Sequence, residues 1–259
     1  MIRFCSVGSG SSGNATLVEA TSGITTTRLL IDAGFSLREL ETRLARVELA
    51  LSDLDAVFVT HEHGDHIGCA VTLAERYDLP IWMSRGTWRA IGESARPRRL
   101  SFARDGETIA VGDLMLRPFT VAHDAAEPLQ LRCSDGENCL GVLTDLGAIT
   151  EHMLEGIAGC AALVLECNHD EAMLAASRYP PSLKARIGGR YGHLSNALAV
   201  ELLASGIAGH LRHLVAAHLS REHNRPEIVR AALASAWGSR PEDLVVADPQ
   251  HGFGWLQLG

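Results

Sequence analysis

The sequence predicts an α/β protein that folds as a four-layered α/β/β/α sandwich. Short apolar runs of strand length alternate with stretches whose apolar residues recur at helical spacing, throughout the 259 residues. The strand-like runs fall into two groups, one in each half, so each half can supply a sheet with helices outside it. The sequence carries no fixed-period repeat, and nothing in it indicates a second domain that folds separately, so we expect one domain over residues 1–259.

The first half begins with strand-like runs and continues with helices that alternate with strands. Its Gly-Ser-Gly-Ser-Ser-Gly segment at 8–13 has the composition of a linker, but its place between two strand-like runs predicts a turn. A β-rich run stops at His61. The expected strands are 2–7, 15–19, 28–32, 56–60 and 80–83, and the expected helices are 37–47 and 68–77.

The second half begins with three apolar runs that suggest an antiparallel meander, with a turn at Ser134-Asp135-Gly136. A buried strand follows, and two helices then flank another strand. The expected strands are 114–121, 129–134, 139–144, 161–166, 213–217, 244–247 and 254–258, and the expected helices are 196–205 and 226–236.

The composition is that of a packed globular protein, with 46% hydrophobic and 21% charged residues. No apolar run reaches the roughly 18 residues of a membrane span, and no secretory signal precedes the first strand, so we expect a cytoplasmic protein. The six cysteines form no C-x-x-C pair. Disulfides are the alternative in a secreted chain, but we expect reduced thiols in the core.

The net charge of −8 opposes non-specific nucleic-acid binding over the whole surface. Arginines nevertheless gather between residues 85 and 104, and Lys184 lies near two arginines. These basic segments are either solvated faces or local phosphate-binding patches on an acidic body. They contain Arg85, Arg89, Arg96, Arg98, Arg99 and Arg104 in one segment, and Lys184, Arg186 and Arg190 in the other.

A dense group of metal-binding side chains follows the predicted strand at 56–60. His61, His63, Asp65 and His66 lie within six residues, which is too dense for one helix face and fits a loop between a strand and a helix. Gly64 is expected to let the backbone turn between the two pairs. Neutral imidazoles and carboxylates are ligands for zinc, iron and manganese, so this loop predicts a metal site.

The loop resembles the H-x-H-x-D-H motif of the metallo-β-lactamase superfamily. The later ligands of that family have counterparts in His123, Asp145 and His218, each placed where a predicted strand ends. The resemblance implies that His61, His63 and His123 hold one metal ion, that Asp65, His66 and His218 hold a second, and that Asp145 bridges both. It implies two divalent metal ions, with zinc as the first expectation and manganese or iron as alternatives.

Other segments resemble particular branches of the superfamily. Tyr191-Gly192-His193-Leu194-Ser195 is similar to the phosphodiesterase branch, where the histidine donates a proton near the scissile phosphate; a histidine in a helix-capping loop is the alternative. The segments 8–14, 122–125, 166–170 and 179–196 resemble the YycJ (WalJ) subfamily, which is associated with 5′ to 3′ DNA exonuclease activity. His223 departs from this pattern, in which asparagine is expected.

These resemblances imply a dinuclear metal-dependent hydrolase that cleaves DNA through a metal-bridged hydroxide, with His193 as general acid and Asp65 and Asp145 as catalytic ligands. The alternatives are a hydrolase of a carboxylic ester, lactone or thioester, and a hydrolase of a small cyclic phosphodiester. A non-enzymatic scaffold is disfavoured because every ligand is present. The residues expected to support the ligands or contact the substrate are Asp32, Asp124, Asn168, His169, Lys184, Arg186 and Arg190. The alternative for Asp32 is an aspartate that only stabilises a turn. The alternative for His169 and Asp170 is that they cap the helix that starts there. No pattern indicates an oligomeric state.

Overall fold

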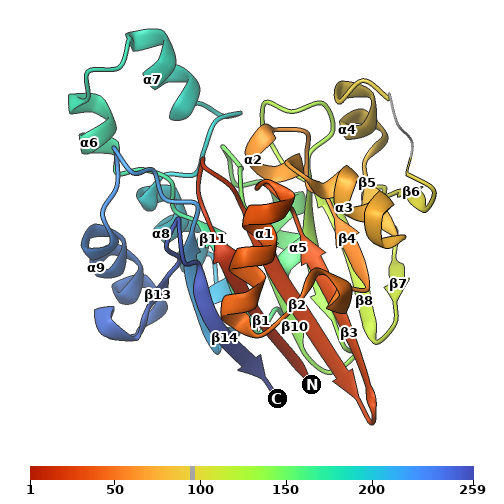
Figure 1. Cartoon of the computed structure of the whole chain (residues 1–259). Coiled ribbons are helices and arrows are strands. Elements are labelled where there is room, and N and C mark those ends of the chain that lie inside the picture. Colours follow the sequence, from red (N-terminus) through yellow and green to blue (C-terminus); the bar gives the residue numbers. More distant parts are fainter. Residues whose placement is uncertain (94–96) are drawn as a thin grey trace.

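Two seven-stranded sheets form the centre of the computed structural model, which describes residues 1–93 and 97–259 (Figure 1). The predicted Arg96 lies outside the described residues. The first sheet has the order β14-β1-β2-β3-β4-β5-β6 and the second the order β13-β12-β11-β10-β9-β8-β7. The strands of the first sheet are β1 (Ile2–Gly8), β2 (Ala15–Ser22), β3 (Thr25–Ile31), β4 (Ala56–Phe58), β5 (Ile81–Met83), β6 (Leu100–Phe102) and β14 (Phe253–Leu258). Those of the second are β7 (Ile109–Val111), β8 (Leu114–Thr120), β9 (Leu129–Ser134), β10 (Cys139–Leu143), β11 (Ala162–Glu166), β12 (His213–Ala217) and β13 (Val245–Val246).

Each sheet is antiparallel on one side and parallel on the other. Strands β14, β1, β2 and β3 pair antiparallel, whereas β3 to β6 pair parallel. Strands β7 to β10 pair antiparallel, as the predicted meander requires, whereas β10 to β13 pair parallel. Both chain ends belong to the first sheet, where Ile2 pairs with Leu258.

Helices cover the outer face of each sheet, and most begin at side-chain caps. The Ser36 hydroxyl accepts a hydrogen bond at the start of α1, and Ser195 does the same for α8. The helices are α1 (Leu37–Leu44), α2 (Gly64–Ile67), α3 (Ala70–Tyr77), α4 (Arg85–Ala90), α5 (Glu151–Ile157), α6 (Glu171–Ala176), α7 (Pro181–Ile187), α8 (Asn196–Ala204) and α9 (Pro226–Trp237). Short 3-10 turns are η1 (Ala45–Val47), η2 (Leu51–Asp53), η3 (Ile207–His210) and η4 (Pro241–Asp243).

Three buried apolar clusters separate the four layers. The cluster between the sheets contains Phe4, Leu29 and Val142, among others. A second cluster lies between the first sheet and α1, α3 and α4, and a third lies between the second sheet and α5, α8 and α9. The predicted α/β/β/α sandwich is therefore confirmed.

Most predicted elements are present, with some ends moved. The predicted helix at 37–47 is α1 followed by η1, and the predicted helix at 68–77 begins only at Ala70 because α2 forms a separate turn before it. All six cysteines are free and buried, as expected of core thiols. Among the described residues, no helix has the length and apolar character needed to span a membrane.

Candidate metal centre and active site

The candidate site lies at the carboxyl ends of the central strands, on the side of the molecule opposite the chain ends (Figure 1). Asp32 follows β3, Asp145 lies just beyond β10, and His218 follows β12. All three have a positive φ, of 62°, 57° and 55° respectively. A positive φ is uncommon for residues with a side chain, and it is found where a functional site holds the backbone in place. The strand ends thus turn these side chains toward one common centre.

His61, His63 and His123 form the first ligand group, which we call the histidine triad. The Nδ1 atom of His63 lies 3.0 Å from His61 Nε2 and 3.3 Å from His123 Nε2. His61 and His123 are buried, and their far nitrogens contact the Thr60 hydroxyl and the Gly192 carbonyl, each at 3.0 Å. The ring positions are therefore set by neutral partners.

Asp65, His66 and His218 form the second group, which we call the mixed group. Asp65 Oδ2 lies 3.6 Å from His66 Nε2 and 3.5 Å from His218 Nε2. His66 and His218 are fully or almost fully buried. Three candidate ligand atoms, one from each residue, lie within 4.8 Å of one another, as they do in the histidine triad.

Asp145 lies between the histidine triad and the mixed group. Its Oδ2 atom is 2.6 Å from His66 Nε2, and its Oδ1 atom is 4.0 Å from His123 Nε2. The structure therefore brings the seven side chains that were predicted as ligands close together. Their candidate ligand atoms fall in overlapping groups, two of which are the histidine triad and the mixed group.

Two buried carboxylates hold the mixed group from behind. Asp32 Oδ2 lies 2.7 Å from His66 Nδ1, and Asp32 also accepts hydrogen bonds from the backbone and hydroxyl of Thr60. Glu166 Oε1 lies 2.9 Å from His218 Nδ1. A carboxylate on the far nitrogen fixes the orientation of the ring and raises its basicity as a ligand.

Glu166 was missed as a site residue by the sequence analysis. It ends the buried strand β11 and is itself fully buried. Besides His218, it accepts hydrogen bonds from His193 Nδ1 at 2.8 Å and from the backbone of Leu146 and Leu194. Glu166 could have been found from the sequence, because it is an acidic residue at the end of an apolar run, as Asp145 is.

The geometry fits metal ions of the predicted kind. Two imidazole nitrogens on one tetrahedral zinc ion lie about 3.3 Å apart, given Zn–N bonds of about 2.0–2.1 Å. The nitrogens of the triad face one another at 3.0 and 3.3 Å. Two buried atoms of the site, Asp145 Oδ2 and His218 Nε2, form no well-aligned hydrogen bond with any described residue, although Asp145 Oδ2 lies 2.6 Å from His66 Nε2, itself a candidate ligand atom. A cation would satisfy both atoms.

The charges of the site shift its pKa values strongly. Burial lowers the pKa of His61 and of His123, which keeps both imidazoles neutral and suited to metal binding. Burial alone would raise the pKa of Glu166, but the neighbouring His193 and the hydrogen bonds from His193 and His218 lower it to about 2. Asp145 raises the pKa of His218 to about 9 despite burial. Glu166 is therefore ionised and supplies negative charge behind His193 and His218.

A pocket of about 240 Å³ opens in front of the two groups. His193 lines it beside Asp65 and Asp145, and the side chain of His193 is 24% exposed. Because Glu166 engages Nδ1, the other ring nitrogen of His193 is left for a group in the pocket.

The other predicted residues divide into those that reach this pocket and those that do not. Asp124 and Arg186 line it and form an ion pair with a shortest distance of 2.6 Å. Asp124 also lies 3.5 Å from His123 Nε2. Lys184 instead donates to the Ala175 carbonyl, and Arg190 is exposed outside the lining.

Asn168, His169 and Asp170 lie behind the pocket. The Asn168 amide donates to the His218 carbonyl at 3.1 Å and so supports the backbone of the mixed group. His169 is buried and lines a neighbouring hollow with Lys184. The Asp170 carboxylate accepts a hydrogen bond from Met173 N and caps α6, which was the alternative interpretation of this residue.

The expected role of Gly64 is wrong. This glycine has no positive φ, and a Cβ atom added there would meet nothing within 4 Å. The close approach occurs at Gly34, where a Cβ atom would lie 1.8 Å from the Asp65 carbonyl, and the unusual backbone occurs at Gly68, with a φ of 30°. These two glycines let the metal-binding loop pack against the end of β3.

Comparisons with known proteins agree with this geometry. Residues 27–218 match the family model described as beta-lactamase superfamily domain. The chain is 36% identical over 237 residues to "Exodeoxyribonuclease YycJ" of Bacillus anthracis, covering 90% of this chain and 88% of that protein. It is 30% identical to "Exodeoxyribonuclease WalJ" of Streptococcus pneumoniae, with 90% and 87% covered.

Solved structures show the same fold at low sequence identity. The metallo-beta-lactamase fold protein YhfI from Bacillus subtilis superposes with a TM-score of 0.73 at 17% identity, over 99% of this chain and 100% of that one. Zn(2+)-bound PqqB from Methylobacterium extorquens superposes with a TM-score of 0.73 at 16% identity, over 99% of this chain and 100% of that one. The family model and the two exodeoxyribonuclease relatives confirm the predicted superfamily and, with it, the class of metal-dependent hydrolases, and the solved structures confirm the fold. The chain belongs to the beta-lactamase superfamily, in the group that includes the YycJ and WalJ proteins.

Proposed function

We propose that this protein is a dinuclear metal-dependent phosphodiesterase that degrades DNA as an exonuclease, with 5′ to 3′ polarity. The observation that carries the proposal is the placement of His193 on the pocket wall next to both ligand groups, held from behind by Glu166. The names of the two relatives, both exodeoxyribonucleases, support DNA as the substrate.

The histidine triad would hold one cation and the mixed group a second, with Asp145 shared between them. Zinc suits the triad, and the carboxylate of Asp65 makes manganese an alternative at the mixed group. When bound, the two cations supply Lewis acidity and a water of lowered pKa.

The side chains of the protein supply orientation and a proton. His193 donates a proton to the leaving sugar oxygen from the ring nitrogen that Glu166 does not engage. Glu166 positions His193 and His218 together, because its Oε1 atom contacts both rings at 2.8 and 2.9 Å. Arg186, on α7, also lines the pocket and would hold a phosphate oxygen of the substrate after its ion pair with Asp124 breaks.

The test is a nuclease assay on end-labelled single-stranded and duplex DNA, with zinc and manganese added separately to metal-stripped protein. We expect stepwise loss of nucleotides from the 5′ end. Parallel assays use bis-p-nitrophenyl phosphate, a lactone and a thioester. Turnover of the lactone or thioester without cleavage of either phosphodiester would overturn the proposal.

A further inference from the structure

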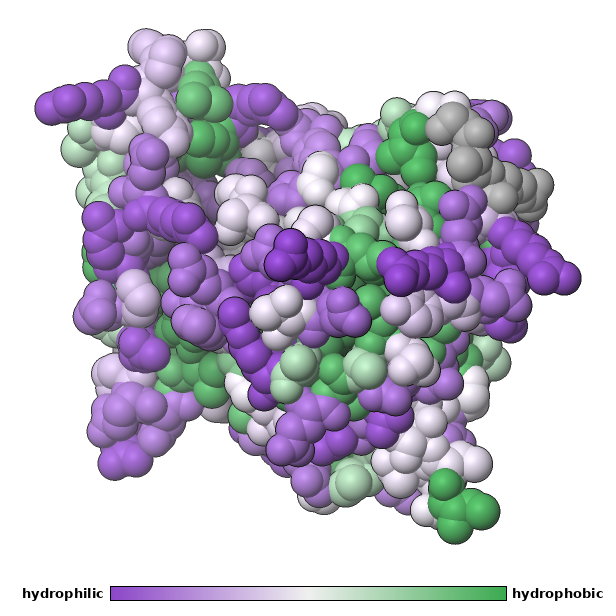
Figure 2. All heavy atoms as spheres, viewed as in Figure 1, coloured by the Kyte–Doolittle hydropathy of each residue, from purple (hydrophilic) through white to green (hydrophobic). Residues whose placement is uncertain are grey.

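A second hollow adjoins the candidate active site at Ser11. It has a volume of about 270 Å³. It shares Ser11 with the pocket of about 240 Å³ in front of the histidine triad and the mixed group, which we call the metal-facing pocket. Its walls come from the turn after β1, from the segment between α6 and α7, and from the segment after His218. Figure 2 shows the α6–α7 projection standing away from the body, with a depression between the two. A chain-like ligand that occupies the metal-facing pocket can thus continue over Ser11.

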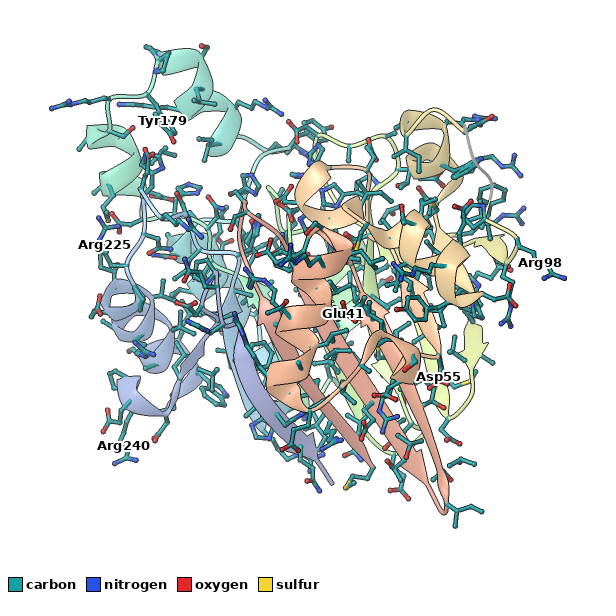
Figure 3. All side chains as sticks on the ribbon, viewed as in Figure 1. Glu41, Asp55, Arg98, Tyr179, Arg225 and Arg240 are labelled. Carbon is teal, nitrogen blue, oxygen red and sulfur yellow. The ribbon has the colours of Figure 1, made fainter. Side chains whose placement is uncertain are left out.

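An aromatic ring and an arginine from two different segments line this hollow. Tyr179 is half-buried on the α6–α7 projection (Figure 3), and Arg221 extends from the segment after His218. The Tyr179 ring packs edge-to-face against the buried ring of His223, with ring centroids 4.6 Å apart. This contact fixes the tyrosine ring and gives a role to His223, the residue that departs from the pattern of the YycJ subfamily.

Arg221 is exposed, and it forms no ion pair with any described residue. Its guanidinium donates a hydrogen bond to the Ser12 hydroxyl at 3.1 Å, which holds it over the turn after β1. Glu222 is the one acidic residue that lines this hollow, and its carboxylate interacts with the Tyr179 hydroxyl. The positive charge of Arg221 is therefore available to a ligand.

The hollow continues away from the metal centre into a third one, which shares Leu219, Ser220, Arg221 and Pro249 with it. Arg225 and Arg230 also line this third hollow, and Figure 3 shows Arg225 on the same side as Tyr179. Its acidic residues are Glu227 and Asp248, and Asp248 already accepts two backbone hydrogen bonds. Three arginines thus follow the path outward on a chain whose net charge is −8.

We propose that Tyr179 and Arg221 form a nucleotide subsite for the DNA strand that leads away from the scissile phosphate. A base stacks on the Tyr179 ring, and Arg221 with Ser12 holds the adjoining phosphate. Base stacking on an aromatic ring and arginine contacts to phosphate are the two elements of sequence-tolerant single-strand binding. This inference rests on the proposed nuclease function and names the residues that make the enzyme prefer a polynucleotide over a small phosphodiester.

The test measures binding and specificity separately on the metal-loaded protein. Binding uses a fluorescent single-stranded oligonucleotide with hydrolysis-resistant phosphorothioate linkages. Specificity is the ratio of kcat/KM for the natural oligonucleotide to kcat/KM for bis-p-nitrophenyl phosphate, which is too small to reach the hollow. The variants are Tyr179→Ala, Tyr179→Phe and Arg221→Ala, with Arg240→Ala as a charge-matched control at the residue that precedes η4, outside the hollow.

Tyr179→Ala is expected to weaken oligonucleotide binding roughly 5- to 150-fold and to lower the specificity ratio, whereas Tyr179→Phe keeps the ring and restores binding. Arg221→Ala is expected to reduce the slope of log Kd against log salt by about 0.7, and Arg240→Ala by much less. If wild-type protein cleaves DNA but Tyr179→Ala and Arg221→Ala bind and cleave like wild type, the subsite is wrong and the proposed function stands. If wild-type protein neither binds nor cleaves DNA, both proposals fail.

Discussion

The histidine triad and the mixed group lie side by side, but different partners hold them from behind. Behind the triad are the Thr60 hydroxyl and the Gly192 carbonyl, which carry no net charge. Behind the mixed group are the buried carboxylates of Asp32 and Glu166. The contrast shows how one motif can build two unlike candidate cation sites. The imidazole rings are the same in both groups, but the groups that contact their far nitrogens are neutral in one and carboxylates in the other.

This difference leads to different expectations for the two metal positions. Neutral imidazoles with neutral partners favour zinc at the triad. At the mixed group, a carboxylate ligand and two supporting carboxylates favour a harder cation. We therefore expect manganese to replace zinc more readily at the mixed group than at the triad. The predictions below test this contrast, beginning with the residue that both groups share.

Asp145→Ala removes the carboxylate that lies between the two groups. We expect loss of metal from both groups and a fall in hydrolysis on the order of 10³-fold or more, because the bridging ligand and the preorganised charge disappear together. Metal content by plasma mass spectrometry and the rate with bis-p-nitrophenyl phosphate check this. Asp243→Ala, an exposed aspartate on η4, is the matched control. A metal-replete, fully active Asp145→Ala protein would contradict the shared role.

His193→Ala tests whether the proton donor is separate from both groups. The variant should keep both metals and lose roughly 10²–10⁴-fold in the rate of DNA cleavage, the usual contribution of a general acid. The loss should be much smaller with a p-nitrophenyl leaving group, which needs no proton. Equal losses on the two substrates would show that His193 does not act as the donor.

Asp32→Asn should lower metal affinity at the mixed group and leave metal affinity at the triad unchanged. The substitution weakens the contact to His66 Nδ1, at 2.7 Å in the wild type, and we expect metal affinity at the mixed group to fall about 10- to 100-fold. Chelator competition, monitored metal by metal, should show one cation released early and the triad's cation retained. If the triad's cation alone were released early, Asp32 would support the triad and not the mixed group, which would contradict this prediction.

Gly64→Ala should have the smallest effect, although this residue lies between His63 of the triad and Asp65 of the mixed group. It opens α2 with space around it and a negative φ, so alanine should stabilise the protein by roughly 0.4–1 kcal/mol. Thermal unfolding measures this, with Gly34→Ala as the contrasting variant, because its Cβ would clash with the Asp65 carbonyl. A lower melting temperature for Gly64→Ala would contradict this account of the loop.

The layers could be predicted from local patterns in the sequence. The side chains that converge at the candidate site could be predicted from their places at strand ends together with the resemblance to the metallo-β-lactamase motif. Apolar periodicity predicts strands and helices, and a polar residue that ends an apolar run marks the functional edge of a parallel sheet, as Asp145 and His218 do. The short helices α4 and α7 and the three-residue strands β6 and β7 were missed because they are too short to show a period.

Long-range partners could not be predicted in the same way. The contact between Glu166 and His193 joins residues 27 positions apart, and that between Tyr179 and His223 joins two loops that meet only after the sheets have packed. The loop motif drew attention to Gly64, whereas the glycine that decides the packing, Gly34, lies outside the motif in the sequence. Contacts between residues that are far apart in the sequence produce no periodic pattern from which they could be predicted.

The pairing of β1 with β14 has a practical consequence for engineering. Ile2 and Leu258 are neighbours in one sheet, at the end of the molecule opposite the metal centre (Figure 1). A short peptide joining residue 259 to residue 1 would therefore close the backbone into a ring without crossing the substrate opening. The ring could be cut again at the tip of the β2–β3 hairpin, where Ile24 is fully exposed. Such a permuted enzyme would carry its new ends, and any fused reporter, far from the candidate active site.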